Sequence, residues 1–481
     1  MKDYEVIIGL EVHAELSTNT KIYCNCTTEF GADPNTHCCP ICTGMPGTLP
    51  VLNEKVVEYA VKAGLATNCE ISRFSKQDRK NYFYPDLPKA YQISQYDLPL
   101  CEHGKLEITV GEGENKYKKE IGITRIHIEE DAGKLIHDAY TGDTLVDMNR
   151  CAVPLIEIVS EPDIRSADEA IAYMQTLKSI LEYLEVCDCK MQEGSLRCDV
   201  NLSVRPVGQK EFGTRTETKN LNSFRAIHNS IEFETKRQIE ELENGGTIYQ
   251  ETRRFDDAKG IGYSMRTKED AHDYRYFPEP DLAPIVLSDN YINEIKNSLP
   301  EMPHIKKDRY IAEYSLPEYD AEQLTASKYV AKFFEDTNAI CHNPKSVSNW
   351  IMSDLFRMMN EKEIEITECK ISSQDLAKLI ELIDKGTISS KIAKQVFEEM
   401  FETGKNPEVI VKEKGLVQIS DENAIKEMVE RVVENNPQSV VDFKAGKDRA
   451  LGFLVGQIMK ETKGKANPQI VNKLLIEILN K

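Results

Sequence analysis

The chain has 481 residues, of which 40% are hydrophobic and 29% charged, and its formal net charge at pH 7 is −20. This length exceeds the size at which one hydrophobic core stops growing, so we expect two or three domains. The acidic charge excludes a general nucleic-acid coat but leaves room for a local basic groove. The N-terminal sequence has no long uncharged apolar run, which predicts a cytoplasmic protein without a membrane span.

The first predicted element is a strand at residues 8–16, where the sequence IGLEVHAEL alternates apolar and polar residues. Successive side chains of a strand point to opposite faces, so Glu11, His13 and Glu15 share one face. Such a face is ordinarily a solvated sheet surface. Carboxylate oxygen and imidazole nitrogen also suit a divalent metal, and this strand alone leaves both interpretations open.

A cysteine-rich loop follows at residues 24–42, which hold five of the 13 cysteines. An odd number of cysteines in a cytosolic type of chain argues against a disulfide framework. Cys24 and Cys26 form one short pair, and Cys39 and Cys42 form a second, with Cys38 as a spare that could replace Cys39. Four thiolates in two such pairs predict a closed, structural tetrahedral zinc site, and the alternative is a group of free thiols.

The remaining elements predict an α+β fold with a mainly antiparallel sheet, because the strands do not alternate regularly with helices. Ser166 and Glu169 form a capping-box pattern that begins a helix reaching about residue 186, and a second helix is predicted at 224–242. Prolines cluster at 278–284 and 300–303, and the sequence beyond them has helical periodicity. With a second break at 403–407, the predicted domains are 1–292, 293–405 and 406–481.

Acidic residues recur in five strand-like segments of the first domain, interleaved with cations. Glu157 interrupts an apolar strand, where an isolated charge is costly unless something positive lies near it. Acids that hold Mg²⁺, beside basic groups that hold phosphate oxygens, are the parts of a phosphoryl-transfer site, although any one segment could be a salt-bridged surface strand. No G-x-x-x-x-G-K-[ST] motif is present, which excludes a P-loop ATPase. The other residues in question are His127, Glu129, Glu130, Asp131, Glu193, Asp199, Asn201, Glu217 and Asn220, with the cations Arg79, Lys80, Lys89, Arg125, Arg150, Arg197, Lys219 and Arg275.

Aromatic residues join the cations in two segments, RKNYFYPDLPKAYQISQYDLPL and DYRYFPEPD. These rings could stack on an adenine or on a tRNA terminal base, and a packed proline-rich loop core is the equal alternative. Late in the chain, Lys444, Lys447, Arg449 and Lys460 gather near a turn with Lys463 and Lys465. This basic group is either a solvated helical face or a local contact for nucleic acid.

Ten motifs in order resemble the GatB family, which forms the B subunit of the tRNA-dependent amidotransferase. They are IGLEVHAEL, CNCTTEFG, CPIC, RKNYFYPDLPKAYQISQYD, GITRIHIEEDAGK, PLIEIVSEPDIRS, EGSLRCDVN, KNLNSFRAI, DYRYFPEPD and GFLVGQIMK. The resemblance covers essentially the whole chain. One departure is Ala152, which stands where the family pattern suggests glycine.

The resemblance implies an activity and its participants. The three domains would be a kinase-type cradle at 1–292, a helical domain at 293–405 and a C-terminal tail at 406–481 similar to the YqeY family. The protein would use ATP and Mg²⁺ to phosphorylate the side-chain carboxylate of Glu-tRNA(Gln) or Asp-tRNA(Asn). In a heterotrimer, an amidase partner would hydrolyse glutamine and supply ammonia to form the amide, and a small third partner would bind the pair together.

The resemblance also implies roles for individual residues. The Mg²⁺ ligands would be Glu11, His13, Glu129 and Glu157, with Glu130, Asp199 and Glu217 as further candidates. Lys89 and Arg275 would neutralise phosphate charge, while Tyr84, Tyr91 and Arg125 would line the nucleotide pocket. The catalytic set is therefore Glu11, His13, Lys89, Glu129, Glu217 and Arg275. Structural Zn²⁺ would bind Cys24, Cys26, Cys39 and Cys42, and the turn at Lys463 and Lys465 would touch the tRNA.

Two alternatives compete with the amidotransferase interpretation. The first is a non-catalytic, zinc-containing scaffold that binds tRNA, which would gain nothing from Glu157 inside an apolar strand. The second is a metal-dependent RNA phosphoesterase, which a similar set of acids and histidine could support. A requirement for ATP would distinguish the amidotransferase, which phosphorylates its substrate, from the phosphoesterase.

Overall fold

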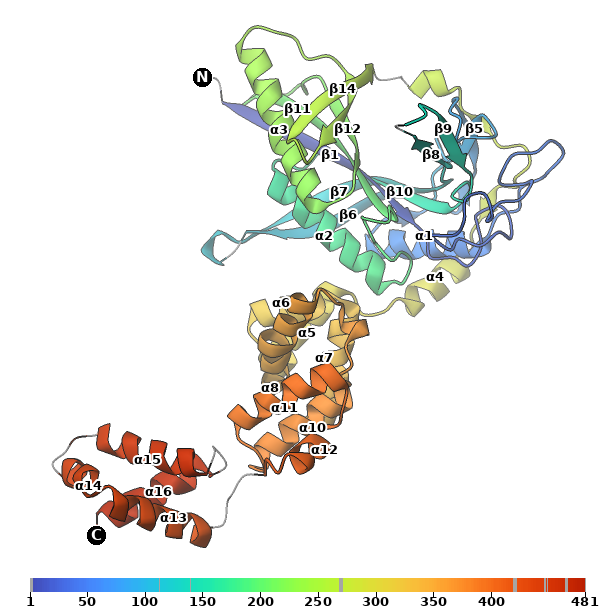
Figure 1. Cartoon of the computed structure of the whole chain (residues 1–481). Helices are drawn as coiled ribbons and strands as arrows, with labels where there is room; N and C mark the ends of the chain where they lie inside the picture. The colour runs from blue at the N-terminus through green and yellow to red at the C-terminus, as the bar shows by residue number, and fades with distance from the viewer. Residues whose placement is uncertain are drawn as a thin grey trace. The chain divides into compact units, whose positions relative to one another are not determined.

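The computed structural model describes residues 3–111, 113–138, 140–267, 271–417, 422–444, 447, 449–462 and 466–480. The chain divides into two compact units, Met1–Pro303 and His304–Lys481. Strands lie in the first unit and the second is helical, which confirms the predicted α+β class (Figure 1). The three-domain division with boundaries at 292 and 405 stays a prediction.

The centre of the first unit is a nine-stranded sheet whose strand order is β14-β13-β12-β11-β1-β10-β7-β6-β2. Neighbouring strands are antiparallel except for the parallel pair β12 and β13, so the mainly antiparallel sheet is confirmed. The N-terminal strand β1 therefore lies in the middle of the sheet. The strands are β1 (Tyr4–Glu15), β2 (Glu70–Ile71), β6 (Cys101–Val110), β7 (Tyr117–Glu130), β10 (Pro154–Ser160), β11 (Leu196–Pro206), β12 (Thr216–Leu221), β13 (Glu251–Asp256) and β14 (Ile261–Thr267).

Helices α1 (Glu54–Ala66), α2 (Ala167–Tyr183) and α3 (Phe224–Glu243) cover one face of this sheet. The β1 side chains Ile8, Leu10, Val12 and Ala14 point toward them and join one core with helix residues. That alternation leaves the intervening side chains of β1 on the opposite face. The sheet thus has one apolar, helix-covered face and one polar face.

Helix α2 begins at the serine cap that the sequence predicts. The Ser166 hydroxyl accepts a hydrogen bond from the N–H of Glu169, so the predicted cap is confirmed. The Glu169 carboxylate, however, accepts from the N–H of Arg165 at 2.7 Å, one residue before the position that a capping box requires. Helix α2 ends at Tyr183, three residues before the predicted end, and α3 ends within one residue of its prediction.

Small sheets connect distant segments beside the main sheet. Strand β4 (Asp78–Asn81) pairs with β5 (Tyr91–Ser94) and with β15 (Phe277–Pro278), which brings the two aromatic segments together. The other pairs are β3 (Phe74–Ser75) with β16 (Ile285–Val286), and β8 (Lys134–His137) with β9 (Thr144–Asp147). The first unit also contains η1 (Gly113–Asn115), η2 (Ala271–Tyr274) and α4 (Asp289–Ser298).

The second unit holds two clusters of buried apolar residues, one drawn from 310–411 and the other from 425–479. Within the described residues, no helix combines the length and the apolar character needed to cross a bilayer. Lys463 and Lys465 lie outside the described residues. The helices from the end of the first unit onward are α5 (Pro303–Tyr314), α6 (Glu318–Thr325), α7 (Lys328–Cys341), α8 (Pro344–Asn349), the π-helix η3 (Trp350–Leu355), α9 (Phe356–Lys362), η4 (Ile366–Glu368), α10 (Ser373–Asp384), α11 (Ser390–Thr403), α12 (Pro407–Glu413), α13 (Glu422–Asn435), α14 (Pro437–Lys444), α15 (Arg449–Glu461) and α16 (Pro468–Leu479).

Candidate functional site

The polar face of the sheet carries the predicted acids, and strand register decides which of them meet. His13 on β1 lies opposite Glu157 on β10, and Glu157 lies opposite His127 on β7. Glu11, two residues before His13, lies opposite Asp199 on β11. The register therefore divides the predicted ligands into two groups, one on each side of β1.

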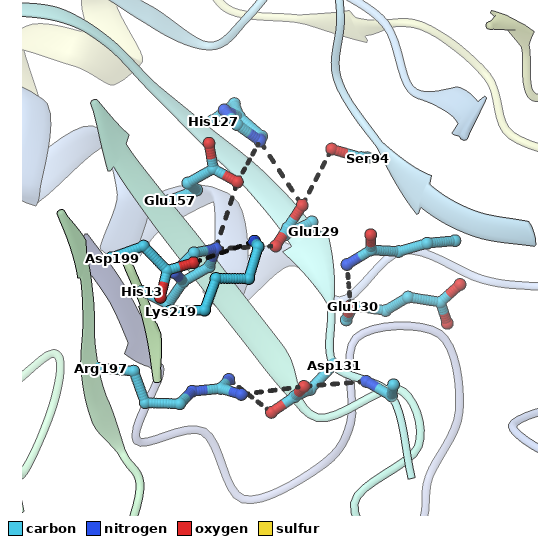
Figure 2. A network of polar contacts seen from close by, with 12 residues as sticks. His13, Ser94, His127, Glu129, Glu130, Asp131, Glu157, Arg197, Asp199 and Lys219 are labelled. Carbon is cyan, nitrogen blue, oxygen red and sulfur yellow. Dashed lines mark hydrogen bonds and ion pairs between the residues drawn. The ribbon is translucent and has the colours of Figure 1, made fainter. Parts of the chain in front are cut away.

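The first group, called the histidine–glutamate cluster, consists of His13, Glu129 and Glu157. One ligand atom from each residue lies within 4.8 Å of the others. The His13 Nε2 atom is 3.3 Å from a Glu157 oxygen and 3.8 Å from a Glu129 oxygen. Behind the carboxylates, His127 Nε2 is 3.6 Å from Glu129 and 3.7 Å from Glu157, and the Ser94 hydroxyl donates to Glu129 (Figure 2).

Burial and neighbouring charges shift the pKa values in this cluster in opposite directions. Burial alone would lower the pKa of His13, but the hydrogen bond and charge of Glu157, with the charges of Asp199 and Glu129, raise it to about 9. Burial favours neutral Glu157, yet His127 and His13 hold the pKa of that carboxyl well below its usual range. The carboxylates are thus ionised and oriented, with oxygen and nitrogen donors that suit a divalent cation.

The second group, called the triple-carboxylate cluster, consists of Glu11, Asp199 and Glu217. Their ligand oxygens also lie within 4.8 Å of one another. The Lys219 ammonium lies 3.1 Å from Asp199 and 3.3 Å from Glu217, while Asn201 donates to Glu11. Burial, followed by the charges of Glu157, Glu217 and Asp199, raises the pKa of Glu11. One lysine therefore leaves the negative charge of this group only partly compensated.

Aromatic rings gather at the β4–β15 edge. Tyr96 and Tyr276 stack with ring centroids 4.4 Å apart, and Tyr274 meets Tyr276 edge-on at 6.0 Å. Tyr82 packs edge-on against Tyr274, also at 6.0 Å. The Lys80 ammonium lies 4.9 Å from the Tyr274 ring centroid, within the range of a cation–π contact.

Lys80 connects these rings to the histidine–glutamate cluster. Burial alone would lower the pKa of Lys80, but the phenols of Tyr276 and Tyr82 and the charges of Glu129 and Glu157 raise it above its ordinary value. Burial and the charge of Glu129 raise the pKa of Tyr276 to about 12, against the opposing charge of Lys80. A permanent positive charge therefore lies beside the acids.

The four predicted thiols lie together, apart from both acidic clusters. One sulfur from each of Cys24, Cys26, Cys39 and Cys42 lies within 4.8 Å of the others, and the Cys39 and Cys42 sulfurs are 3.9 Å apart. Tetrahedral zinc with Zn–S bonds of about 2.3 Å places its sulfurs roughly 3.8 Å apart. The thiols therefore fit zinc with little movement.

The thiol group has a buried cation beside it. Lys21 is fully buried, and its ammonium lies 3.7 Å from the Cys42 sulfur while donating to the His37 carbonyl. Hydrogen bonding from Cys24, the Cys39 N–H and the charge of Lys21 lower the pKa of the Cys42 thiol to about 5. This lysine reduces the excess negative charge that four thiolates and one zinc ion would carry. The spare Cys38 instead donates to the Asn35 carbonyl.

Comparison with known proteins decides the family. Residues 6–293 match the GatB/GatE catalytic domain, and residues 332–479 match the GatB domain. The chain belongs to the GatB family. It is 66% identical to the B subunit of the aspartyl/glutamyl-tRNA(Asn/Gln) amidotransferase of Caldicellulosiruptor bescii over the whole length of both chains. Relatives of the same name from Thermoanaerobacter pseudethanolicus (99% of this chain, 100% of the relative) and Clostridium botulinum strain 657 (100% of both) are 64% and 58% identical.

Both acidic clusters, the aromatic group and the thiol group fall inside the GatB/GatE catalytic match, whereas several predicted nucleotide ligands lie away from the clusters. Lys89 pairs with Glu130 at 2.6 Å, and its ammonium faces the rings of Tyr23 and Tyr91 at 5.7 and 5.5 Å. Arg125 donates to the Tyr96 carbonyl. In this GatB-family chain the Lys89 ammonium therefore pairs with Glu130 and not with a member of the histidine–glutamate cluster.

The two remaining predicted residues lie at the surface. Arg275 is exposed, and its Nε atom donates to the Asp273 carbonyl at 3.4 Å. The Tyr84 ring lies 6.0 Å from Tyr82, at the exposed end of the aromatic group. The sequence places Lys80 among the cations of the acidic segments but predicts no specific role for it in the site. Its alternation with Tyr82 in the motif RKNYFY was the available signal, because both side chains would share one face of a strand.

Proposed function

We propose that this chain is the B subunit of an aspartyl/glutamyl-tRNA(Asn/Gln) amidotransferase and that it activates the side-chain carboxylate of Glu-tRNA(Gln) or Asp-tRNA(Asn). The carboxylate oxygen attacks the γ-phosphorus of ATP, the bond to the bridging oxygen breaks, and ADP leaves. Ammonia then attacks the acyl carbon and displaces phosphate, which leaves the amide. Full-length similarity to proteins of that name supports the assignment.

The observation that carries the chemical proposal is the histidine–glutamate cluster with Lys80 beside it. Two anions, a carboxylate and a phosphoryl group, must approach each other, so the site needs fixed positive charge and fixed geometry. The His13, Glu129 and Glu157 donors fit Mg²⁺, which would supply charge neutralisation of the phosphate oxygens when bound. Ser94 and His127 hold the two glutamates in place for that role.

The aromatic group is proposed to hold a base and to exclude water. The stacked pair Tyr96 and Tyr276 and the edge-on ring of Tyr274 offer flat faces beside Lys80. Stacking on such faces is worth about 1–3 kcal/mol per base. Lys80, whose charge the nearby phenols and acids favour, is proposed to orient phosphate oxygens toward the cluster.

The roles proposed from the family for Lys89, Arg275, Tyr84, Tyr91 and Arg125 have weaker support. Lys89 would have to leave Glu130, a carboxylate that is only 2% exposed, to reach a phosphate. Arg275, Tyr84 and Tyr91 remain proposed nucleotide contacts because they lie on the same two segments as the aromatic group. Arg125, on β7, remains one because it donates to the carbonyl of Tyr96.

We further propose that the thiol group holds one structural zinc ion. The sulfur separation and Lys21 support it. The proposed partners in the cytoplasm are an amidase that releases ammonia from glutamine, a small third protein that joins the two, and the misacylated tRNA. The relatives are named as the B subunit of an amidotransferase, which supports a complex with other proteins.

An ATP-dependent transamidation assay with the amidase and the small third protein, on both misacylated tRNAs, tests the proposal. The wild-type complex should form amidated tRNA and ADP in equal amounts. His13→Ala should reduce this rate at least about 100-fold while tRNA binding persists, because ligand loss exceeds the usual effect of outer residues. The exposed His137, on β8, provides the control His137→Ala, which should keep the wild-type rate.

The same assay separates the alternatives. Amide formation without ATP, or full activity of His13→Ala, would refute the proposed chemistry. A scaffold would bind tRNA without forming ADP, and a phosphoesterase would cleave RNA without requiring ATP.

A further inference from the structure

An apolar groove of about 760 Å³ lies beside the contact between helices α1 and α4 (Figure 1). Its lining comes from two segments that are distant in the sequence, residues 50–57 and residues 281–291. We propose that this groove binds an extended, apolar segment of a partner protein, and that the segment carries a basic residue. The inference goes beyond the proposed function and rests on it only for the existence of partner proteins.

Branched apolar side chains are exposed on the groove. Val51 and Val286 are each 73% exposed, and both line it. The neighbouring Ile285 and Leu287 line it too, but they are buried in the core of the first unit. Leu49, two residues before Val51, is 63% exposed. Exposed apolar side chains that gather on one surface are typical of a site that another molecule covers.

The groove also borders an open strand edge. Strand β16 pairs with β3 alone among the described strands. The Leu287 N–H donates to the Arg73 carbonyl at 3.0 Å, so the backbone groups of Leu287 face β3. Successive residues of an antiparallel strand point their backbone groups to alternate sides, so the N–H and C=O of Val286 point to the open edge. An extended peptide can pair with such an edge and place alternate side chains into an adjoining pocket.

The charged residues that line the groove are both acidic. Glu54 is exposed in the first turn of α1, and the described part of the chain holds no ion pair to it. Asp281 is also exposed, but its carboxylate lies 3.4 Å from an Arg79 nitrogen, so its charge is partly compensated. Among the described residues, no lysine or arginine lines the groove. An uncompensated acid beside apolar surface favours a segment in which lysine or arginine accompanies apolar residues.

A small-molecule ligand and a second copy of the chain are the competing occupants. Sites for small molecules combine apolar walls with several converging polar groups. The Ser288 hydroxyl, which lines the groove, already accepts from the Tyr291 N–H at 3.2 Å as the cap of α4. The groove therefore offers apolar surface and a backbone edge, which suit a polypeptide better than a small ligand.

Surface plasmon resonance of the full-length chain with the amidase and with the small third protein, each alone and as a mixture, tests the groove. Neither ATP nor tRNA is added. Val51→Glu should weaken binding at least about 100-fold, because it brings an unpaired charge into an apolar contact. The control Val207→Glu changes a valine that is 66% exposed and directly follows β11, and it should leave binding unchanged.

A pair of variants at Val286 tests the strand edge. Val286→Pro removes the outward N–H, which an edge strand tolerates, and should weaken binding about tenfold. Val286→Thr keeps the N–H and the branched shape and should have a smaller effect. Glu54→Gln should weaken binding about threefold and reduce its dependence on salt, because it removes the charge that faces the basic residue. Circular dichroism of every variant checks that the fold is kept.

Three results would overturn the proposal. Equal binding of the wild type and Val51→Glu, or an equal effect of Val286→Pro and Val286→Thr, would overturn the groove alone and leave the proposed transamidation intact. Failure of the wild type to bind either partner would overturn the groove and the proposed complex together. A dimer of the chain alone in sedimentation velocity, disrupted by Val51→Glu, would identify a second copy as the occupant.

Discussion

Gly44, two residues after the cysteine-rich loop, is expected to control the buried ion pair between Lys89 and Glu130. Its φ is +69°, and a Cβ atom there would lie 2.4 Å from Cγ of Lys89 and 3.3 Å from the Lys89 backbone. Because Cγ is close to the backbone, the lysine cannot avoid this contact by moving its end alone. Gly44→Ala should therefore displace Lys89 from Glu130.

The magnitude follows from the groups involved. Gly47, three residues later, also has a positive φ, +85°, but an added Cβ would have nothing within 4 Å. Each alanine carries a backbone cost of about 1–2 kcal/mol in this conformation. Only Gly44→Ala also leaves the buried Glu130 carboxylate without its cation, which costs about 3 kcal/mol more. Gly47→Ala thus serves as the matched control.

Hydrogen exchange at Ile93 measures the difference, because its N–H donates to a Glu130 oxygen at 2.9 Å. A loss of about 3 kcal/mol in local opening free energy corresponds to about 100-fold faster exchange. We expect this acceleration at Ile93 in Gly44→Ala beyond any change in Gly47→Ala. Equal exchange in the two variants would show that the loop does not support the ion pair.

Two further predictions concern the thiol group and the α3 helix. Cys39→Ser should lower zinc content, measured by atomic emission, well below one equivalent, whereas Cys38→Ser should retain one; equal content in both would contradict the proposed ligand set. Glu234 of α3 accepts from Gln238 and pairs with Arg237 and Arg253. Burial alone would raise the pKa of Glu234, but these three partners hold it below its ordinary value. A lowered pKa stabilises the fold above the unfolded pKa and loses this effect as pH falls, so Glu234→Gln should cost about 3 kcal/mol near neutral pH. Urea unfolding at several pH values should show that cost shrinking toward acid, and a cost independent of pH would oppose the assignment.

Local patterns in the sequence were sufficient for the helices α2 and α3 and for the polar face of β1, but they did not predict α1. Alternation placed Glu11 and His13 on one face, and the structure agrees. Alternation contains no information about pairing register, however, because register depends on contacts between segments that are distant in the sequence. The four predicted ligands were therefore combined into one site, although Glu11 pairs with Asp199 and His13 with Glu157.

Backbone geometry explains why the family pattern suggests glycine at position 152, where this chain has alanine. Ala152 has φ +62° and is 1% exposed, so it occupies a left-handed conformation that glycine adopts more easily. The family's expected glycine has a physical reason at this position. Lys89 shows what the sequence could not predict. A lysine suits a phosphate contact, but neither composition nor spacing indicates that its ammonium pairs with the buried Glu130 carboxylate.

The central position of β1 determines when the site can form during synthesis. Residues 4–15 leave the ribosome well before their partner strands, which begin at residues 154 and 196. At about 5–20 residues per second, the first strand waits roughly 10 to 40 s for both neighbours. During that interval Ile8, Leu10 and Val12 lack the neighbouring strands against which they are buried in the folded chain. Both acidic clusters come into existence only when this early segment is finally captured.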